Sequence, residues 1–140
     1  MSGISPKHSD TVRRAAKNRC GYCQLPQEIT ASLLDIEHIL PKARGGTDAE
    51  ENLWLACRDC NCHKSTKVEA FDYITEQTLP LFNPRTQNWR EHFRFSEDKT
   101  RIIGTTACGR ATVIALRLNN EQAVNARGLW VVAGWYPPQD

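Results

Sequence analysis

The chain has 140 residues, of which 40% are hydrophobic and 24% are charged, the composition of one ordinary globular domain rather than a largely disordered chain. The formal net charge of +2 excludes a strongly cationic DNA-coating protein but allows a local basic patch. No apolar run approaches the roughly 20 residues of a transmembrane helix, and residues 1–10 lack the apolar segment of a secretory signal. We therefore expect a cytoplasmic protein without a membrane partner, in which six cysteines favour metal binding over disulfides.

The first predicted elements are a short helix and a tight turn. Ser9 or Asp10 is a suitable N-cap for a helix that we expect to continue through Arg19. Residues 20–23 read Cys-Gly-Tyr-Cys, a glycine-containing turn that presents two thiols. Residues 24–32 contain proline and no clear apolar period, which predicts a loop.

The middle of the chain predicts two strands followed by a helix. Apolar residues over 33–40 and 52–56 indicate strands, and the polar segment 42–51 between them indicates a loop. A second Cys-x2-Cys turn covers residues 57–60. It leads into a helix that we expect over about 59–73, so the whole segment predicts a β-loop-β-α unit.

The last third of the chain predicts a hairpin and then a helix. The hairpin would pair strands at 93–96 and 101–104. After Thr106, apolar residues recur with helical spacing, which predicts an amphipathic helix. The residues of this apolar face are Ala111, Ile114, Ala115 and Leu118.

A final helix is expected from Asn120 to about Ala133, where Gly134 would end it. Its packing residues would be Val124, Leu129, Val132 and Trp135. We place three tryptophans in the core, namely Trp89, Trp130 and Trp135.

The two Cys-x2-Cys turns have the same spacing and together predict a closed tetrahedral site for a structural zinc ion. Its four ligands would be Cys20, Cys23, Cys57 and Cys60. Such a site leaves no open coordination position, so the zinc would hold the strands together rather than take part in catalysis. Cys62 and Cys108 lie outside the pattern and are interpreted as packing residues.

Several spaced motifs between and after these turns resemble the HNH endonuclease family of the zinc-knuckle type. The motifs are Glu37-His38-Ile39-x-Pro41, Gly45-Gly46, Asn52-Leu53 and Cys57-x2-Cys60-Asn61-x2-Lys64. The resemblance covers roughly residues 17–71, and Asn61 at the third named position is similar to the H-N-N variant. It implies an enzyme that hydrolyses DNA phosphodiester bonds, with RNA not excluded as a substrate.

The resemblance also implies roles for the site residues. His38 would be the general base, because a neutral imidazole is available near pH 7. Glu37 and Asn61 would hold a catalytic Mg²⁺ or Mn²⁺ through oxygen atoms. Adjacent strand residues point to opposite faces, so Glu37 and His38 can share one ion only where the strand twists or bulges. Asn52 would hydrogen-bond the loop or His38.

Each of these roles has a plainer structural alternative. Glu37 would then be a salt-bridge partner, and Asn61 would cap the helix. His63 is a secondary candidate for the metal, although it lies two residues after Asn61 and so should face away from it. The expected phosphate contacts are Lys42, Arg44, Arg58, Lys64 and Lys67. Lys64 has the alternative of being a solvated surface charge.

Taken together, the sequence predicts an α+β fold with a small ββα-metal core held by a four-cysteine zinc site. Residues 1–75 would form the nuclease core with its N-terminal helix, and residues 76–140 a hairpin and helical extension packed on the core. The alternative function is a zinc-stabilised nucleic-acid-binding or adaptor subunit of a larger restriction, phage or defence complex. The paired motif around His38 favours the enzyme, since a binding protein has no use for a base beside a carboxylate.

Overall fold

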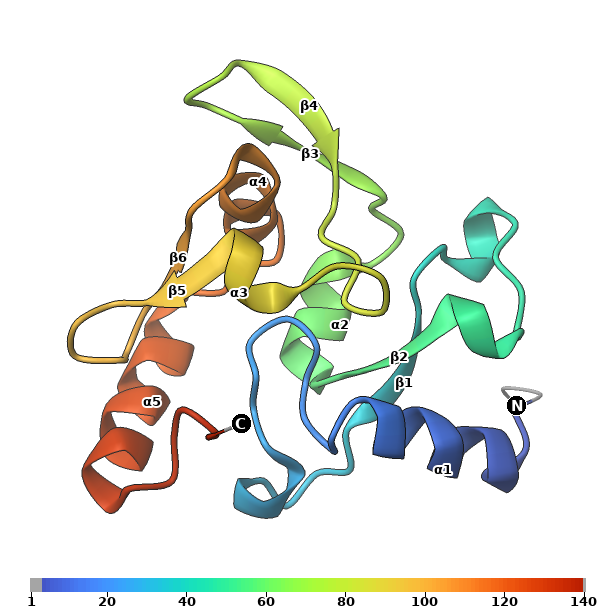
Figure 1. Ribbon diagram of the computed structural model, residues 1–140, viewed down its shortest axis with the longest axis horizontal. Coiled ribbons are helices and arrows are strands. Elements are labelled where there is room, and N and C mark those ends of the chain that lie inside the picture. The colour runs from blue at the N-terminus through green and yellow to red at the C-terminus, as the bar shows by residue number, and fades with distance from the viewer. Residues whose placement is uncertain (1–3, 140) are drawn as a thin grey trace.

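The computed structural model describes residues 4–139, which form five α-helices, three short 3-10 helices and three two-stranded antiparallel sheets (Figure 1). The helices are α1 (Pro6–Ala15), α2 (Arg58–Lys64), α3 (Trp89–His92), α4 (Ala107–Ala115) and α5 (Glu121–Ala133). The sheets pair β1 (Asp35–His38) with β2 (Leu53–Ala56), β3 (Glu69–Asp72) with β4 (Gln77–Pro80), and β5 (Phe93–Phe95) with β6 (Ile102–Gly104). Within the described residues, no helix is long and apolar enough to cross a bilayer.

The β1–β2 hairpin and α2 form the predicted ββα unit at the centre of the molecule (Figure 1). In the register of the hairpin, Glu37 faces Trp54 and His38 faces Leu53 on the partner strand. Cys57 ends β2 and also caps α2, because its Sγ accepts a hydrogen bond from the Cys60 backbone nitrogen (3.4 Å). The chain therefore passes from β2 into α2 without an intervening loop.

Helix α1 begins earlier than predicted. Ser5 is its N-cap and accepts a hydrogen bond from the backbone nitrogen of His8 (3.2 Å), so the expected cap at Ser9 or Asp10 is wrong. Pro6 explains the shift, because proline has the backbone angle of a first helical residue and needs no amide partner there.

Helix α2 ends at Lys64, well before the predicted end near residue 73. The following Ser65 has a positive φ of 50°, which takes the chain out of the helix. The sequence analysis missed the β3–β4 hairpin that follows, which projects from one end of the molecule (Figure 1). Asp72 builds its turn by accepting from the nitrogen and hydroxyl of Thr75 (3.1 and 2.7 Å), and Arg110 of α4 binds the same carboxylate (2.9 and 3.1 Å).

The C-terminal elements follow the predicted order. The β5–β6 hairpin, α4 and α5 all form, and Gly134 ends α5 with a φ of 81°. Their packing differs from the prediction, because four expected core residues are largely exposed, namely Ile114, Leu129, Val132 and Trp135. Helix α5 is held instead by buried Arg127, whose guanidinium donates to the carbonyls of Leu118 (2.6 Å) and Thr100 (3.1 Å).

The two expected domains share one hydrophobic core. Trp89 stacks on Phe93 with ring centroids 5.1 Å apart, and its indole nitrogen donates to the Tyr22 carbonyl (2.8 Å). Buried Tyr136 donates its hydroxyl to the carbonyl of Cys23 (2.6 Å). The expected boundary at 75/76 lies in the turn of the β3–β4 hairpin, and residues 1–3 and 140 lie outside the described residues.

Candidate functional site

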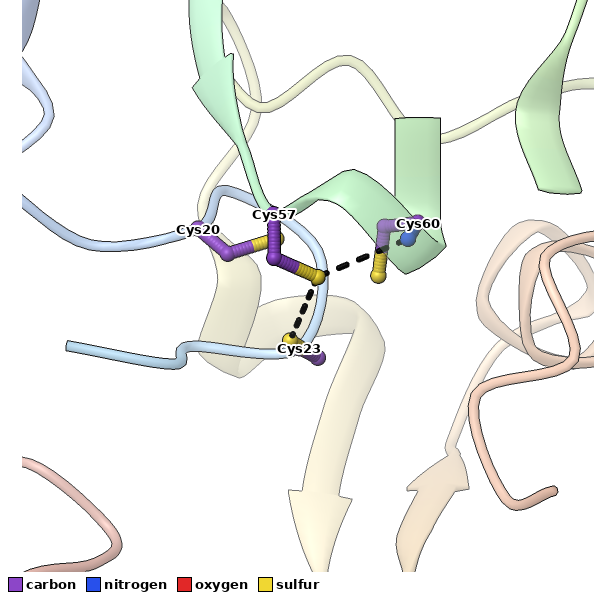
Figure 2. A group of neighbouring side chains, drawn as sticks. All are labelled: Cys20, Cys23, Cys57 and Cys60. Carbon is purple, nitrogen blue, oxygen red and sulfur yellow. Dashed lines mark hydrogen bonds between the residues drawn. The ribbon is translucent and has the colours of Figure 1, made fainter. Parts of the chain in front are cut away.

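Four cysteine thiols converge between the N-terminal turn and the start of α2 (Figure 2). The Sγ atoms of Cys20, Cys23, Cys57 and Cys60 all lie within 4.8 Å of one another, and all four residues are buried. Cys23 Sγ and Cys57 Sγ are 3.7 Å apart. A tetrahedral zinc site with Zn–S bonds of about 2.3 Å places its sulfurs about 3.8 Å apart, so this geometry fits zinc.

The protonation of these thiols also fits a cation. Burial opposes ionisation of Cys20, but hydrogen bonds from the other three thiols hold its pKa well below the usual range. The pKa values of Cys57 and Cys60 are raised, mainly because both donate hydrogen bonds to Cys20. Four thiolates can therefore coexist here only with a positive ion between them, which is the role of a structural Zn²⁺.

His38 forms a second site at the end of β1, on the side of the loop that leads to β2. Its Nε2 donates to Asp48 Oδ1 (2.7 Å), and the ammonium of Lys42 lies 3.2 Å from Asp48 Oδ2. The His38 and Asp48 side chains are 18% and 30% exposed, so a water molecule can reach them. The hydrogen bond from His38 holds the pKa of Asp48 below its ordinary value, with help from Lys42, and keeps the carboxylate ionised at neutral pH.

Asn52 holds the loop that carries Asp48. Its side chain accepts from the Leu40 nitrogen (2.8 Å) and donates to the carbonyls of Leu40 (3.0 Å) and Thr47 (2.9 Å). Gly46 lies so close that an added Cβ would come within 1.7 Å of the Leu40 carbonyl oxygen. The Asn52 side chain therefore hydrogen-bonds the loop and not the His38 imidazole.

Glu37 lies on the other face of β1, as the alternation of strand side chains requires. The residue is 1% exposed, and its Oε1 accepts a short hydrogen bond from the Tyr22 hydroxyl. Among the described residues, no donor makes a well-aligned hydrogen bond to its Oε2. The Lys64 ammonium, 3.3 Å from Oε2, supplies the positive partner. Burial raises the pKa of Glu37, and both the charge of Lys64 and the Tyr22 hydrogen bond oppose this.

This arrangement corrects two expected roles. Glu37 is closed off from solvent and already paired with a cation, so the expected pair of Glu37 and Asn61 does not fit a divalent ion as the structure stands. Lys64 is 3% exposed and donates to the carbonyls of His38 and Ile39 (both 3.0 Å), so it is neither a phosphate contact nor a solvated charge. The surroundings of Glu37 therefore fit the structural alternative, a salt bridge with Lys64, better than the metal role.

Asn61 and His63 point to different neighbours. The Asn61 amide donates to Asp35 Oδ2 (3.3 Å), on the same side of β1 as Glu37. His63 donates from Nδ1 to the Leu116 carbonyl (3.0 Å), which turns it toward the C-terminal half. The structure therefore does not join His63 to the His38 site.

The remaining basic residues lie at the surface around α2 and the loop after β1. Arg58 is 72% exposed at its side chain, and its Nη2 is 3.7 Å from Asp35 Oδ1. Arg44 donates to the Thr66 carbonyl (2.5 Å) and Lys67 to the His63 carbonyl (2.7 Å), and both residues are exposed. Together with Lys42, they leave charge available to a polyanion.

Asp48 could not be identified as the partner of His38 from the sequence alone. The polar loop between His38 and Asn52 contains several acidic residues, and their spacing does not indicate which of them reaches His38. Tyr22 has no role predicted from the sequence, and its hydroxyl donates a hydrogen bond to Glu37.

Comparison with known proteins gives one family. Residues 20–67, from the first cysteine turn to just beyond α2, match the model of the family described as HNH endonuclease. No curated protein and no solved structure matches the chain.

Proposed function

We propose that the protein is an endonuclease that hydrolyses DNA phosphodiester bonds with His38 as general base, from the premise that residues 20–67 match the HNH endonuclease family model. The observation that carries the proposal is the hydrogen bond between His38 and Asp48 at a water-accessible edge of the ββα unit. An imidazole held in this way is suited to remove a proton from water.

The proposed reaction is a hydrolysis in which the water proton passes to His38. The resulting hydroxide attacks phosphorus, and the bond from phosphorus to the 3′ oxygen breaks. The 3′ oxygen leaves with a proton, which gives a 3′-hydroxyl and a 5′-phosphate. Exposed Lys42, Arg44 and Lys67 would hold the neighbouring phosphates without reading the base sequence.

The family also implies a catalytic Mg²⁺ or Mn²⁺. The buried Glu37 carboxylate is paired with Lys64, so the proposed reaction does not depend on an ion held by Glu37. The same observation favours one second candidate, a zinc-stabilised DNA-binding or adaptor subunit that does not cut.

Plasmid cleavage by the zinc-loaded protein tests the first candidate. We expect nicked or linear DNA with Mg²⁺ or Mn²⁺, and we expect His38→Ala to slow cleavage by roughly 100-fold or more while binding DNA equally well. His8→Ala, which removes an exposed imidazole in α1, is the matched control and should cut normally. The no-metal arm should omit the ion rather than add a chelator, because a chelator would also compete for the cysteine-bound zinc.

Two results would contradict the proposal. Cleavage that survives His38→Ala would remove His38 as the base. A folded wild-type protein that binds DNA in a filter or anisotropy assay, and leaves the plasmid intact with every ion tried, would favour the noncatalytic candidate.

A further inference from the structure

The polar loop after β1 brings one carboxylate onto the imidazole of the proposed base. We propose that Asp48 is a positioning residue: it keeps the proton of His38 on Nε2 and so leaves the lone pair on Nδ1 to take the proton from water. This inference rests on the proposed function and assigns to it a residue that lies outside the sequence motifs named above.

The contact has the geometry of a charge-assisted hydrogen bond. His38 Nε2 and Asp48 Oδ1 are 2.7 Å apart, which is short for a nitrogen donor and typical of a carboxylate acceptor. A carboxylate can only accept, so the ring nitrogen that faces it must carry the hydrogen. The other carboxylate oxygen lies 3.2 Å from the Lys42 ammonium, which fixes the plane of the carboxylate.

Both partners are held by elements outside the pair. On one side, buried Lys64 donates to the His38 carbonyl (3.0 Å) and so holds the end of β1. On the other side, Asn52 binds both Leu40 and Thr47, the residue immediately before Asp48. The imidazole and the carboxylate are therefore in place before any substrate arrives, which removes the cost of aligning them during the reaction.

The charge of Asp48 serves the proton transfer as well as the orientation. When His38 accepts a proton from water it becomes a cation, and a carboxylate at hydrogen-bond distance stabilises that cation. The pKa of Asp48 is held low by His38 and Lys42, so the carboxylate stays ionised and does not itself take the proton. The water proton thus stays on the imidazole during the attack and passes to solvent afterwards, while the 3′ oxygen, which leaves from the opposite side of phosphorus, takes its proton from a solvent water.

The first measurement is the tautomer of His38 in the intact zinc-loaded protein. Long-range ¹H–¹⁵N correlation spectra at about pH 8 distinguish a protonated from a bare ring nitrogen. We expect Nε2 protonated and Nδ1 bare in the wild type, and a mixture of the two tautomers in Asp48→Asn. Glu51→Gln removes an exposed carboxylate from the same loop and should leave the His38 signals unchanged.

Plasmid cleavage kinetics supply the second measurement. Asp48→Asn should lower kcat by roughly 10- to 100-fold, less than the roughly 100- to 10,000-fold that a general base itself contributes. Its KM should not rise, because the substitution removes a negative charge from a surface that would face DNA. A loop that had merely lost its structure would raise KM as well, and Glu51→Gln should match the wild type in both constants.

Each outcome bears on the inference. An unprotonated Nε2 in the wild-type protein would overturn the positioning role of Asp48. This test needs no variant, so the role can be disproved even if Asp48→Asn does not fold. Normal kcat in a folded Asp48→Asn would overturn it while wild-type cleavage upholds the proposed function. A wild-type protein that never cuts would instead overturn the proposed function, and the catalytic role of Asp48 with it.

Discussion

Glu37 and His38 are neighbours in sequence with opposite environments. The imidazole faces the loop and solvent, whereas the carboxylate is sealed in with Tyr22 and Lys64. A buried ion pair adds little net stability, because desolvation of both charges offsets their attraction. Losing one partner is much more costly, because the remaining charge stays buried without compensation.

We therefore predict that Glu37→Gln destabilises the protein by about 3 kcal/mol, because it leaves the buried Lys64 ammonium unpaired. The double variant Glu37→Gln/Lys64→Met should recover at least half of this loss, since it removes the second charge as well. Urea denaturation of the zinc-loaded proteins measures both effects, with the exposed Glu97→Gln as control.

Cleavage by the double variant separates structure from metal binding. If Glu37 is only a structural partner, Mg²⁺ still activates cleavage by the folded double variant, and its rate falls no further than in Lys64→Met alone, which also lacks the bond to the His38 carbonyl. A stable double variant that has lost its Mg²⁺-dependent cleavage would restore Glu37 as a metal ligand.

At the scale of elements, the β3–β4 hairpin is held in place by a contact with α4, a helix distant in sequence. Asp72 is buried, and its pKa lies well below the ordinary value chiefly because the Arg110 guanidinium hydrogen-bonds it. The contact joins residues that are 38 positions apart in the chain. A carboxyl with a lowered pKa in the folded state stabilises the protein above its unfolded pKa of about 3.9 and loses that effect as the pH falls further.

We expect Asp72→Asn to lower the melting temperature at pH 7, because Arg110 loses its ionised partner. The difference from the wild type should shrink steadily below about pH 4, where the carboxyl of the unfolded wild-type chain begins to take up a proton while that of the folded protein is still ionised. Thermal unfolding between pH 3 and pH 7 measures this, and Glu69→Gln on the same hairpin serves as the exposed control. A difference that stays constant over this range would exclude the ion pair as its cause.

The elements that the sequence predicts correctly are those with a local cause. The paired cysteines mark the turns, Cys57 both ends β2 and caps α2, and Gly134 ends α5. The errors arise where the sequence carries no such local signal. Helix α2 ends just before Ser65, a non-glycine residue with a positive φ, and the hairpin beyond it is anchored by the bond from Arg110 to Asp72. Helix α5 buries a polar anchor, Arg127, while several of its apolar residues stay exposed.

The candidate site divides in the same way. His38 and the four cysteines follow from motif and spacing, because their neighbours in sequence identify them. The partner of His38 and the burial of Lys64 depend on how a loop folds back and on how α2 packs on β1. No periodic pattern in the sequence indicates the contact between His38 and Asp48 or the burial of Lys64.

At the scale of the whole molecule, the four-cysteine site joins the N-terminal turn to the ββα unit. We predict that Cys57→Ser lowers the zinc content of the purified protein from about one ion per chain to near zero. Serine can still cap α2, so the loss of roughly 5 kcal/mol or of the fold itself would come from the metal. Elemental analysis and circular dichroism measure the two effects.

Cys62→Ser is the matched control, because Cys62 is exposed one turn away on α2. It should retain zinc and stability. Equal zinc content in both variants would show that the ion, where present, does not sit among the four buried thiols.

The bond from the Tyr136 hydroxyl to the Cys23 carbonyl spans 113 residues. At a synthesis rate of about 5–20 residues per second, Tyr136 is synthesised roughly 6–23 s after Cys23. Trp89, which binds the neighbouring Tyr22 carbonyl, arrives earlier and closes the same turn from the other side. The order of translation thus sets the order of assembly, because the contact of Trp89 with the cysteine turn can form before that of Tyr136.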